Sequence, residues 1–418
     1  MNDRPAVTIR ARADRQYIRP NDRSHRFVLV ELTAPPATHT RRRPPVNLAF
    51  VIDRSGSMSG QKLELAKQAV IDGIERLDDR DRFTVVAYDD EVRVVVETTT
   101  ATEPARRDAN AHLRDLQTGG STNLSGGWFA GCEQVAARLD PDAVNRALLL
   151  TDGLANVGII DALELSHHAA ELRARGISTT TFGVGNDFDE ALLQSMADAG
   201  GGHFYFIADA AQIRDHIASE VGETLEVVAR DVAFEVVAAE GIRLEAISPQ
   251  KLSPGNQRST VFVGDLVADQ AVEIVLRVTF PYGELGRDTR VMIDHHGKVE
   301  RLTWTYADDR TNDAQVRDRD VDRAVARQFA ARARQEAVQL NRRHEFDAAR
   351  RVLEGTAKRI RRYGGHDPVL KRLVQELDAE TVAMSAPMPE PSLKQMHFAS
   401  ANQARSRDSM GRSIKRPS

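Results

Sequence analysis

The chain has 418 residues, which is too long for one ordinary hydrophobic core and indicates two or three domains. Its 57 lysines and arginines nearly balance 61 aspartates and glutamates, so no global attraction to nucleic acid or a membrane surface is expected. The start of the sequence shows no apolar signal segment, and no run approaches the roughly 20 apolar residues of a membrane helix. The single cysteine, Cys132, excludes an internal disulfide and suits a reducing compartment, so we expect a cytoplasmic, bacterial or archaeal protein with this thiol in a core.

The first part of the chain, residues 7–35, contains two strand-like segments. Two strands are too few to bury a sheet alone, so we expect them to pair with strands from elsewhere in the chain. The Arg- and Pro-rich segment 41–45 follows and is expected to be a linker. The first part of the chain therefore belongs to a domain that is completed later in the sequence.

Residues 45–225 alternate short apolar, β-branched segments with amphipathic helical patterns. Strands are predicted at 46–52, 83–88, 92–98, 146–151, 177–184 and 203–208. This alternation is typical of an α/β domain with a doubly wound, mainly parallel sheet. Only three residues separate the second and third strands, too few for a crossover, so the third strand should pair antiparallel at an edge.

Residues 226–310 return to strand patterns without a long helical segment between them, which favours an antiparallel β-sandwich. Because the strands of residues 1–44 need partners, we predict that they join this sandwich and that the α/β domain of residues 45–225 is inserted into it. The adjacent His295 and His296 lie between two predicted strands and indicate a hairpin turn more than a metal site.

The last part of the chain is predicted to be helical and then disordered. Residues 311–384 place apolar side chains on single helix faces, with a polar break at 341–345 that indicates an antiparallel helical hairpin. Residues 385–418 are rich in Pro, Ser, Met and scattered basic residues, so we expect a disordered tail.

Oxygen-bearing side chains follow the ends of predicted strands in the α/β domain. Asp53, Ser55 and Ser57 follow its first strand, Thr122 precedes a helix, and Asp152 follows the strand at 146–151. Open α/β sheets bind ligands beyond the carboxyl ends of their strands, so these side chains should converge. Two carboxylates and three hydroxyls suit Mg²⁺, or else Mn²⁺ or Ca²⁺, and the lack of Cys and His argues against Zn²⁺. With only two negative charges facing it, the ion would stay electrophilic and could take a carboxylate from a partner.

Each of these segments also has a simpler interpretation. Ser57 or Ser59 could cap the following helix, and Asp152-Gly153 is a common turn dipeptide. Thr122 could merely shape its loop. The occurrence of all three segments in chain order, each where the fold needs it, favours a metal site.

These residues resemble the metal-ion-dependent adhesion site of von Willebrand factor A (VWA) domains, and the resemblance covers about residues 45–225. Asp53-x-Ser55-x-Ser57, Thr122 and Asp152 match the five positions of that site. The resemblance implies that Ser55, Ser57 and Thr122 bind the metal directly, and that Asp53 and Asp152 act largely through waters. The wider layout is similar to bacterial VWA proteins distantly related to inter-alpha-trypsin inhibitor heavy chains, in which a β-sandwich surrounds the VWA domain and a helical segment follows.

The sequence therefore predicts a non-enzymatic protein-binding module that coordinates an Asp or Glu of a partner protein through the metal. The alternative is a metal-assisted hydrolase or phosphoryl-transfer enzyme on the same fold. Arg54 is the only candidate catalytic group that accompanies the ligands in the sequence, and the P-loop and nucleophile-elbow motifs are absent. The oligomeric state is left open.

Overall fold

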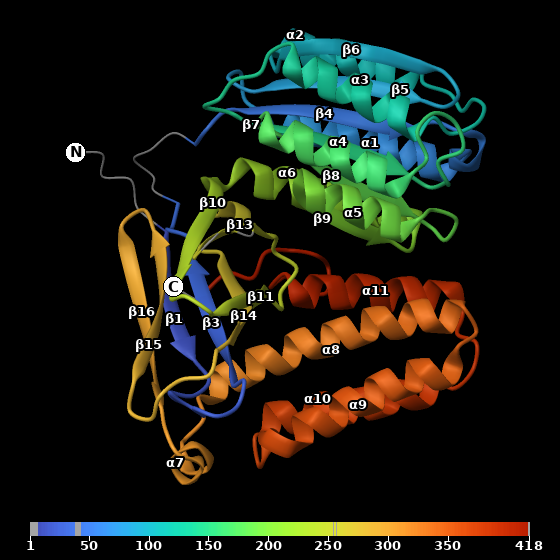
Figure 1. Ribbon diagram of the computed structural model, residues 1–418. Coiled ribbons are helices and arrows are strands. Elements are labelled where there is room, and N and C mark those ends of the chain that lie inside the picture. The colour runs from blue at the N-terminus through green and yellow to red at the C-terminus, as the bar shows by residue number, and fades with distance from the viewer. Residues whose placement is uncertain (1–6, 38–42, 254, 256, 417–418) are drawn as a thin grey trace.

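The computed structural model describes residues 7–37, 43–253, 255 and 257–416. Part of the predicted linker at 41–45 and the outermost residues of the first and last predicted domains lie outside these ranges. The described chain has three parts, which are an α/β part, a β part with two sheets, and a group of long helices beside both (Figure 1).

The α/β part contains a six-stranded sheet in the order β6-β5-β4-β7-β8-β9. Its strands are β4 (Val46–Asp53), β5 (Arg82–Tyr88), β6 (Val92–Thr100), β7 (Val144–Thr151), β8 (Ile177–Val184) and β9 (Gly201–Ile207). All neighbours pair parallel except β6, which pairs antiparallel with β5 at one edge. The predicted doubly wound sheet with its antiparallel edge strand is confirmed, and each predicted strand end lies within two residues of the observed one.

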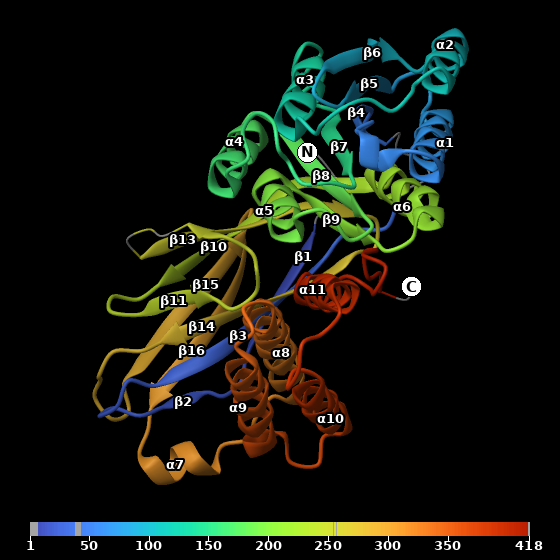
Figure 2. The same cartoon turned by 90° about the vertical axis from the view of Figure 1, so that its right-hand side faces the viewer.

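Helices cover both faces of this sheet (Figure 2). They are α1 (Gln61–Glu75), α2 (Glu103–Arg114), α3 (Leu124–Ala136), α4 (Ala162–Ala174), α5 (Glu190–Gly200) and α6 (Ile213–Leu225), with short 3₁₀ turns η1 (Gly56–Met58) and η2 (Ala210–Gln212). Helices α1, α2 and α6 lie on one face and α3, α4 and α5 on the other. Every residue of β4 and β7 is therefore buried, which explains the apolar runs 48–52 and 147–150 within these strands. Cys132 of α3 is buried in this core, as predicted.

The β part is built from strands that precede and follow the α/β part. These strands are β1 (Thr8–Ala13), β2 (Tyr17–Ile18), β3 (His25–Thr33), β10 (Val227–Ala238), β11 (Arg243–Ala246), β12 (Leu252–Ser253), β13 (Arg258–Val267), β14 (Ala271–Thr279), β15 (Asp288–His295) and β16 (Lys298–Tyr306). One sheet has the order β1-β3-β14-β11 and the other β12-β13-β10-β15-β16-β2. Pairing is antiparallel, except that the short β2 runs parallel to β16.

The two sheets of the β part share one hydrophobic core. Val30 and Leu32 of β3 pack in the same cluster as Phe234 of β10 and Trp304 of β16. The nine-residue pairing of β3 with β14 joins segments that lie on opposite sides of the α/β part in sequence. The turn at His296 connects β15 to β16, so the predicted hairpin at this position is confirmed.

The remaining chain forms α7 (Asp309–Ala314), α8 (Arg319–Arg342), α9 (Phe346–Gly364), α10 (Pro368–Ala383) and α11 (Glu390–Ala404). Helix α8 packs against both α9 and α11, and α10 packs against α9. Within the described ranges, none of these or the other helices is long and apolar enough to cross a lipid bilayer.

The predicted disorder of residues 385–418 is wrong for the described part of that segment. Helix α11 buries Leu393, Phe398, Ala401 and Ala404, and Phe398 packs edge-on against Phe204 of β9. The buried face of α11 consists mainly of small and polar residues, so its sequence looked unable to pack. It needs only a few large side chains because it lies between α8 and the edge strand β9.

Candidate metal centre

Both predicted carboxylates lie at the carboxyl edge of the parallel sheet. Asp53 is the last residue of β4, and Asp152 follows the last residue of β7. These strands are paired neighbours in the middle of the sheet. The chain leaves β4 toward one face and β7 toward the other, so the two carboxylates lie at the topological switch point, where open α/β sheets bind ligands.

The predicted site residues do come together. The Ser57 hydroxyl donates to Asp152 Oδ1 at 2.6 Å, and the Ser55 and Ser57 hydroxyl oxygens are 3.1 Å apart. A Cβ placed on Gly153 would lie 3.5 Å from both Ser57 Oγ and Thr122 Oγ1. Four predicted ligands from three separate segments therefore face one small volume.

Asp53 is fully buried beneath this cluster. One of its carboxylate oxygens accepts a hydrogen bond from the Ser55 N–H at 2.8 Å and the other from the Thr151 hydroxyl at 2.7 Å. Burial raises the pKa of Asp53, the hydrogen bonds from Ser55 and Thr151 oppose this rise, and the negative charge of Asp152 adds to it. A cation between the two carboxylates would offset the cost of burying them together.

The donor set fits a hard divalent cation. Neighbouring oxygens of an octahedral Mg²⁺, with metal–oxygen distances near 2.1 Å, are about 2.9 Å apart. The separations at Ser57, 2.6 Å to Asp152 and 3.1 Å to Ser55, bracket that value. The oxygen-only chemistry of these side chains also suits Mg²⁺, Mn²⁺ or Ca²⁺ better than a softer metal.

Two of the simpler interpretations, the helix cap and the loop-shaping role of Thr122, receive no support from the local geometry. Helix α1 is capped by Gly60 and has no side-chain capping bond, so neither Ser57 nor Ser59 caps it. The Thr122 backbone is held by Asn156, whose side chain accepts from the Thr122 N–H at 2.9 Å and whose own N–H donates back at 3.2 Å. The loop at Thr122 is thus shaped by backbone contacts that do not use its hydroxyl.

Lys62 is a site residue that sequence reasoning missed. Its ammonium lies 2.5 Å from Asp152 Oδ2, and its side chain remains about one-third exposed. The residue stands in the first turn of α1, where the helix dipole disfavours a positive charge. A lysine at that position, just after the Asp-x-Ser-x-Ser turn, was the signal that could have drawn attention to it.

Arg54, the one cationic side chain with a candidate enzymatic role in the sequence, is held in an ion pair. Its guanidinium lies 3.0 Å from Asp89, a buried residue that follows β5. Asp89 also accepts from the Gly120 N–H at 3.0 Å, and the Gly119 N–H donates to the Arg54 carbonyl at 2.7 Å. These contacts tie the loop after β4 and the loop before α3, which carry predicted ligands, to the loop after β5.

A second group of potential metal ligands is explained by ion pairing. His203, Glu220 and Glu223 offer ligand atoms within 4.8 Å of one another. Arg407 donates to Glu223 at 2.5 Å and lies 3.0 Å from His203 Nε2, while Glu220 accepts from Arg146 at 2.7 Å. Burial and the positive charge of Arg407 hold the pKa of His203 well below its ordinary value, so the imidazole is neutral and accepts from Arg407.

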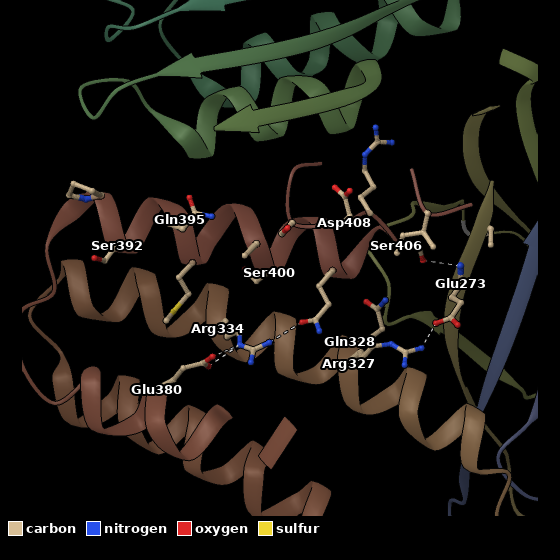
Figure 3. A pocket seen from close by; sticks show the side chains of 18 residues that line it. Glu273, Arg327, Gln328, Arg334, Glu380, Ser392, Gln395, Ser400, Ser406 and Asp408 are labelled. Carbon is tan, nitrogen blue, oxygen red and sulfur yellow. Dashed lines mark hydrogen bonds and ion pairs between the residues drawn. The ribbon is translucent and has the colours of Figure 1, made fainter. Parts of the chain in front are cut away.

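A cavity of about 1090 Å³ lies between α8, α11 and the segment 406–414 (Figure 3). Its two prominent arginines are already paired, Arg327 with Glu273 and Arg334 with Glu380. The paired charges give the cavity no clear preference for an anionic or a cationic ligand. It is remote from the five predicted metal ligands, none of which lines it.

Residues 47–219 match the family model of the von Willebrand factor type A domain. This part of the chain is a VWA domain. The chain is 32% identical to the protein YfbK of Escherichia coli (strain K12) over 195 residues, which are 46% of this chain and 34% of that protein. It is also 27% identical over 159 residues to human inter-alpha-trypsin inhibitor heavy chain H3, a match covering 37% of this chain and 18% of the heavy chain. The chain thus matches only 34% of the length of YfbK and 18% of the length of the heavy chain.

Solved structures share the fold over nearly the whole chain. A von Willebrand factor type A protein from Catenulispora acidiphila superposes with a TM-score of 0.70 at 20% identity, covering 96% of this chain and 91% of that one. The ArnB paralog VWA2 from Sulfolobus acidocaldarius gives a TM-score of 0.62 at 17% identity, covering 95% and 99% of the two chains. At these identities the likeness shows the fold alone.

Proposed function

We propose that the VWA domain is a non-enzymatic protein-binding module that holds a divalent cation at a metal-ion-dependent adhesion site. The ion is Mg²⁺, with Mn²⁺ or Ca²⁺ as alternatives, and its ligands are Asp53, Ser55, Ser57, Thr122 and Asp152. The partner is a protein that offers an Asp or Glu side chain to the metal. VWA domains generally mediate metal-dependent protein interactions, and the convergence of these side chains at one sheet edge carries the proposal.

The chemistry of binding follows from the charges and burial of these residues. The hydroxyls of Ser55, Ser57 and Thr122 would bind the ion directly, while Asp53 and Asp152 would act largely through waters. Two carboxylates supply the only negative charge among the five, so the metal keeps affinity for a further anionic oxygen. Ser57 is exposed to solvent whereas Asp53 is buried, so a partner carboxylate would approach from the side of Ser57.

The enzyme alternative gains no support from the site. The two cations beside the ligands, Lys62 and Arg54, are paired with Asp152 and Asp89. VWA domains are typically interaction modules, and binding alone requires no further catalytic group.

We further propose that the VWA domain, residues 45–225, is inserted into a discontinuous β-sandwich made of residues 1–44 and 226–310. The pairing of β3 with β14 supports this division. The helical region, proposed from the sequence as residues 311–384, is extended here through α11 because that helix packs on α8. The sandwich and helices would then present the VWA domain to its partner.

Titration of Mg²⁺ by isothermal calorimetry tests the metal site. We expect Asp152→Asn and Thr122→Val each to weaken binding at least about tenfold, because the first removes a negative charge and the second a hydroxyl ligand from a small oxygen-only site. The matched control is Asp142→Asn, which alters an exposed aspartate just before β7, at the opposite end of the sheet. Equal Mg²⁺ affinity in all four proteins would refute the site assignment.

A further inference from the structure

The connection that follows Asp152 carries a group of exposed apolar side chains. Leu154, Ile160 and Leu163 are 58%, 59% and 83% exposed. Single exposed apolar side chains are common on protein surfaces, whereas here three large ones lie within ten residues of sequence. We call these three residues the apolar rim.

The backbone beneath the apolar rim is anchored to the metal-binding loops. Asn156 is bonded to Thr122 through both its side chain and its N–H, and the Ile159 N–H donates to Ser125 Oγ at 2.9 Å. Asp161 then caps α4 by accepting from the Glu164 N–H at 2.8 Å. The rim is therefore presented on a braced connection that touches one proposed metal ligand directly.

The apolar rim and the metal site share one edge of the sheet. Helix α4 follows the carboxyl end of β7, so its first turn, with Leu163, begins at the same edge of the sheet as Asp152. A partner side chain that reaches the metal from solvent passes beside this connection, because Gly153 lies against the hydroxyls of Ser57 and Thr122.

Other connections at the same edge carry exposed carboxylates. Asp90 and Glu91 lie between β5 and β6, and Asp187 and Asp189 follow β8. These negative charges would repel a partner segment with several acidic residues, although the metal attracts one carboxylate. The edge is thus complementary to a single negative charge accompanied by apolar surface.

We propose that the partner segment presents one isolated Asp or Glu next to large apolar side chains, and that those side chains bind the apolar rim. This inference rests on the proposed function, since the acidic residue must reach the metal. It goes further in assigning Leu154, Ile160 and Leu163 to partner recognition and in excluding polyacidic segments as ligands.

A selection experiment with defined probes tests the inference. Phage displaying random twelve-residue peptides are bound to the full-length protein in Mg²⁺ and eluted with EDTA. The expected sequences have one Asp or Glu within two positions of Leu, Ile, Phe, Val or Trp. EDTA-eluted peptides with acidic runs, or without apolar neighbours, would overturn the inference while leaving the proposed function intact. A lack of EDTA-dependent enrichment would count against both.

Variants then connect the selected peptides to the apolar rim. Fluorescence anisotropy with a selected peptide should show at least tenfold weaker binding to the combined variant Leu154→Ser, Ile160→Ser and Leu163→Ser, with Mg²⁺ affinity unchanged by calorimetry. The control is Leu139→Ser, which alters a 41% exposed leucine before β7, at the opposite end of the sheet. Wild-type peptide affinity in the triple variant would contradict the inference. Loss of Mg²⁺ binding would also contradict the inference, because these side chains, which carry no metal-binding atom, would then support the loops of the metal site and not bind the partner.

Discussion

Removing the charge of Glu220 should destabilise the protein through a buried ionic cluster. Glu220 is fully buried and accepts hydrogen bonds from Arg146 at 2.7 Å, Thr180 at 2.8 Å and Tyr205 at 2.8 Å. Arg146 also reaches Asp265 of β13 at 3.1 Å. The cluster therefore joins the VWA sheet and α6 to the β part, and its loss would affect both.

The size of this expected loss of stability follows from the pKa of Glu220. Burial alone would raise it, but the positive charges of Arg146 and Arg407 and the bond from Thr180 outweigh burial and lower it from 4.5 to about 2. At 1.36 kcal/mol per unit, this difference corresponds to about 3 kcal/mol of stability. Because the folded-state pKa lies below the unfolded one, this contribution is complete above about pH 4.5. It is lost as the pH falls toward 2.

Urea unfolding followed by tryptophan fluorescence measures the effect. At pH 7, Glu220→Gln should lower the free energy of unfolding by about 3 kcal/mol or more, because it leaves the Arg146 charge buried without its main partner. Between pH 4.5 and 2, the variant should lose about 3 kcal/mol less stability than the wild type. Glu164→Gln, at an exposed position of α4, is the control. The same loss of stability in wild type and Glu220→Gln over this range would refute the reasoning.

Two further substitutions test contacts around the VWA domain. Lys62→Met should tighten Mg²⁺ binding about tenfold in calorimetry, because the Lys62 ammonium and the divalent ion both lie beside Asp152 and repel each other. This repulsion is on the order of 1–2 kcal/mol even in water. Unchanged Mg²⁺ affinity would contradict this competition. Arg407→Ala should lower the free energy of unfolding by about 3 kcal/mol, because it leaves the Glu223 carboxylate without its ion-pair partner. It should also accelerate tryptic cleavage in residues 405–416. Arg412→Ala, at an exposed position in the same segment, should leave the free energy of unfolding unchanged.

The VWA domain was predictable because its sequence carries local and topological signals that agree. Parallel strands covered on both faces carry continuous apolar runs, such as 48–52 and 147–150, and these runs identified β4 and β7. A three-residue connection cannot cross a sheet, which fixed the direction of β6. The approach of Ser57 to Asp152 and of Thr122 to Gly153 followed from the rule that parallel strands end at one edge of a sheet.

The features that were missed depend on tertiary contacts with weak sequence patterns. Lys62 pairs with Asp152 from 90 residues away, and only its unfavourable place in a first helical turn hinted at a partner. Helix α11 buries Ser400 and Asn402 as well as Phe398, so its buried face is not distinguished by apolar residues. Its packing depends on β9, which supplies the apolar surface that α11 covers.

The position of α11 explains how the helical region supports the edge of the VWA sheet at which the proposed metal site lies. Strand β9 is an edge of the VWA sheet, and α11 covers it by packing Phe398 against Phe204 and Phe206. Near the start of α11, Lys394 donates to Glu190 at 2.7 Å, in the first turn of the helix that follows the carboxyl end of β8. Just beyond its end, Arg407 binds Glu223 at the opposite end of the sheet. The helix and the residues just after it thus contact the VWA domain at both the amino and the carboxyl ends of the parallel strands. They leave the loop of Asp152 open to a partner.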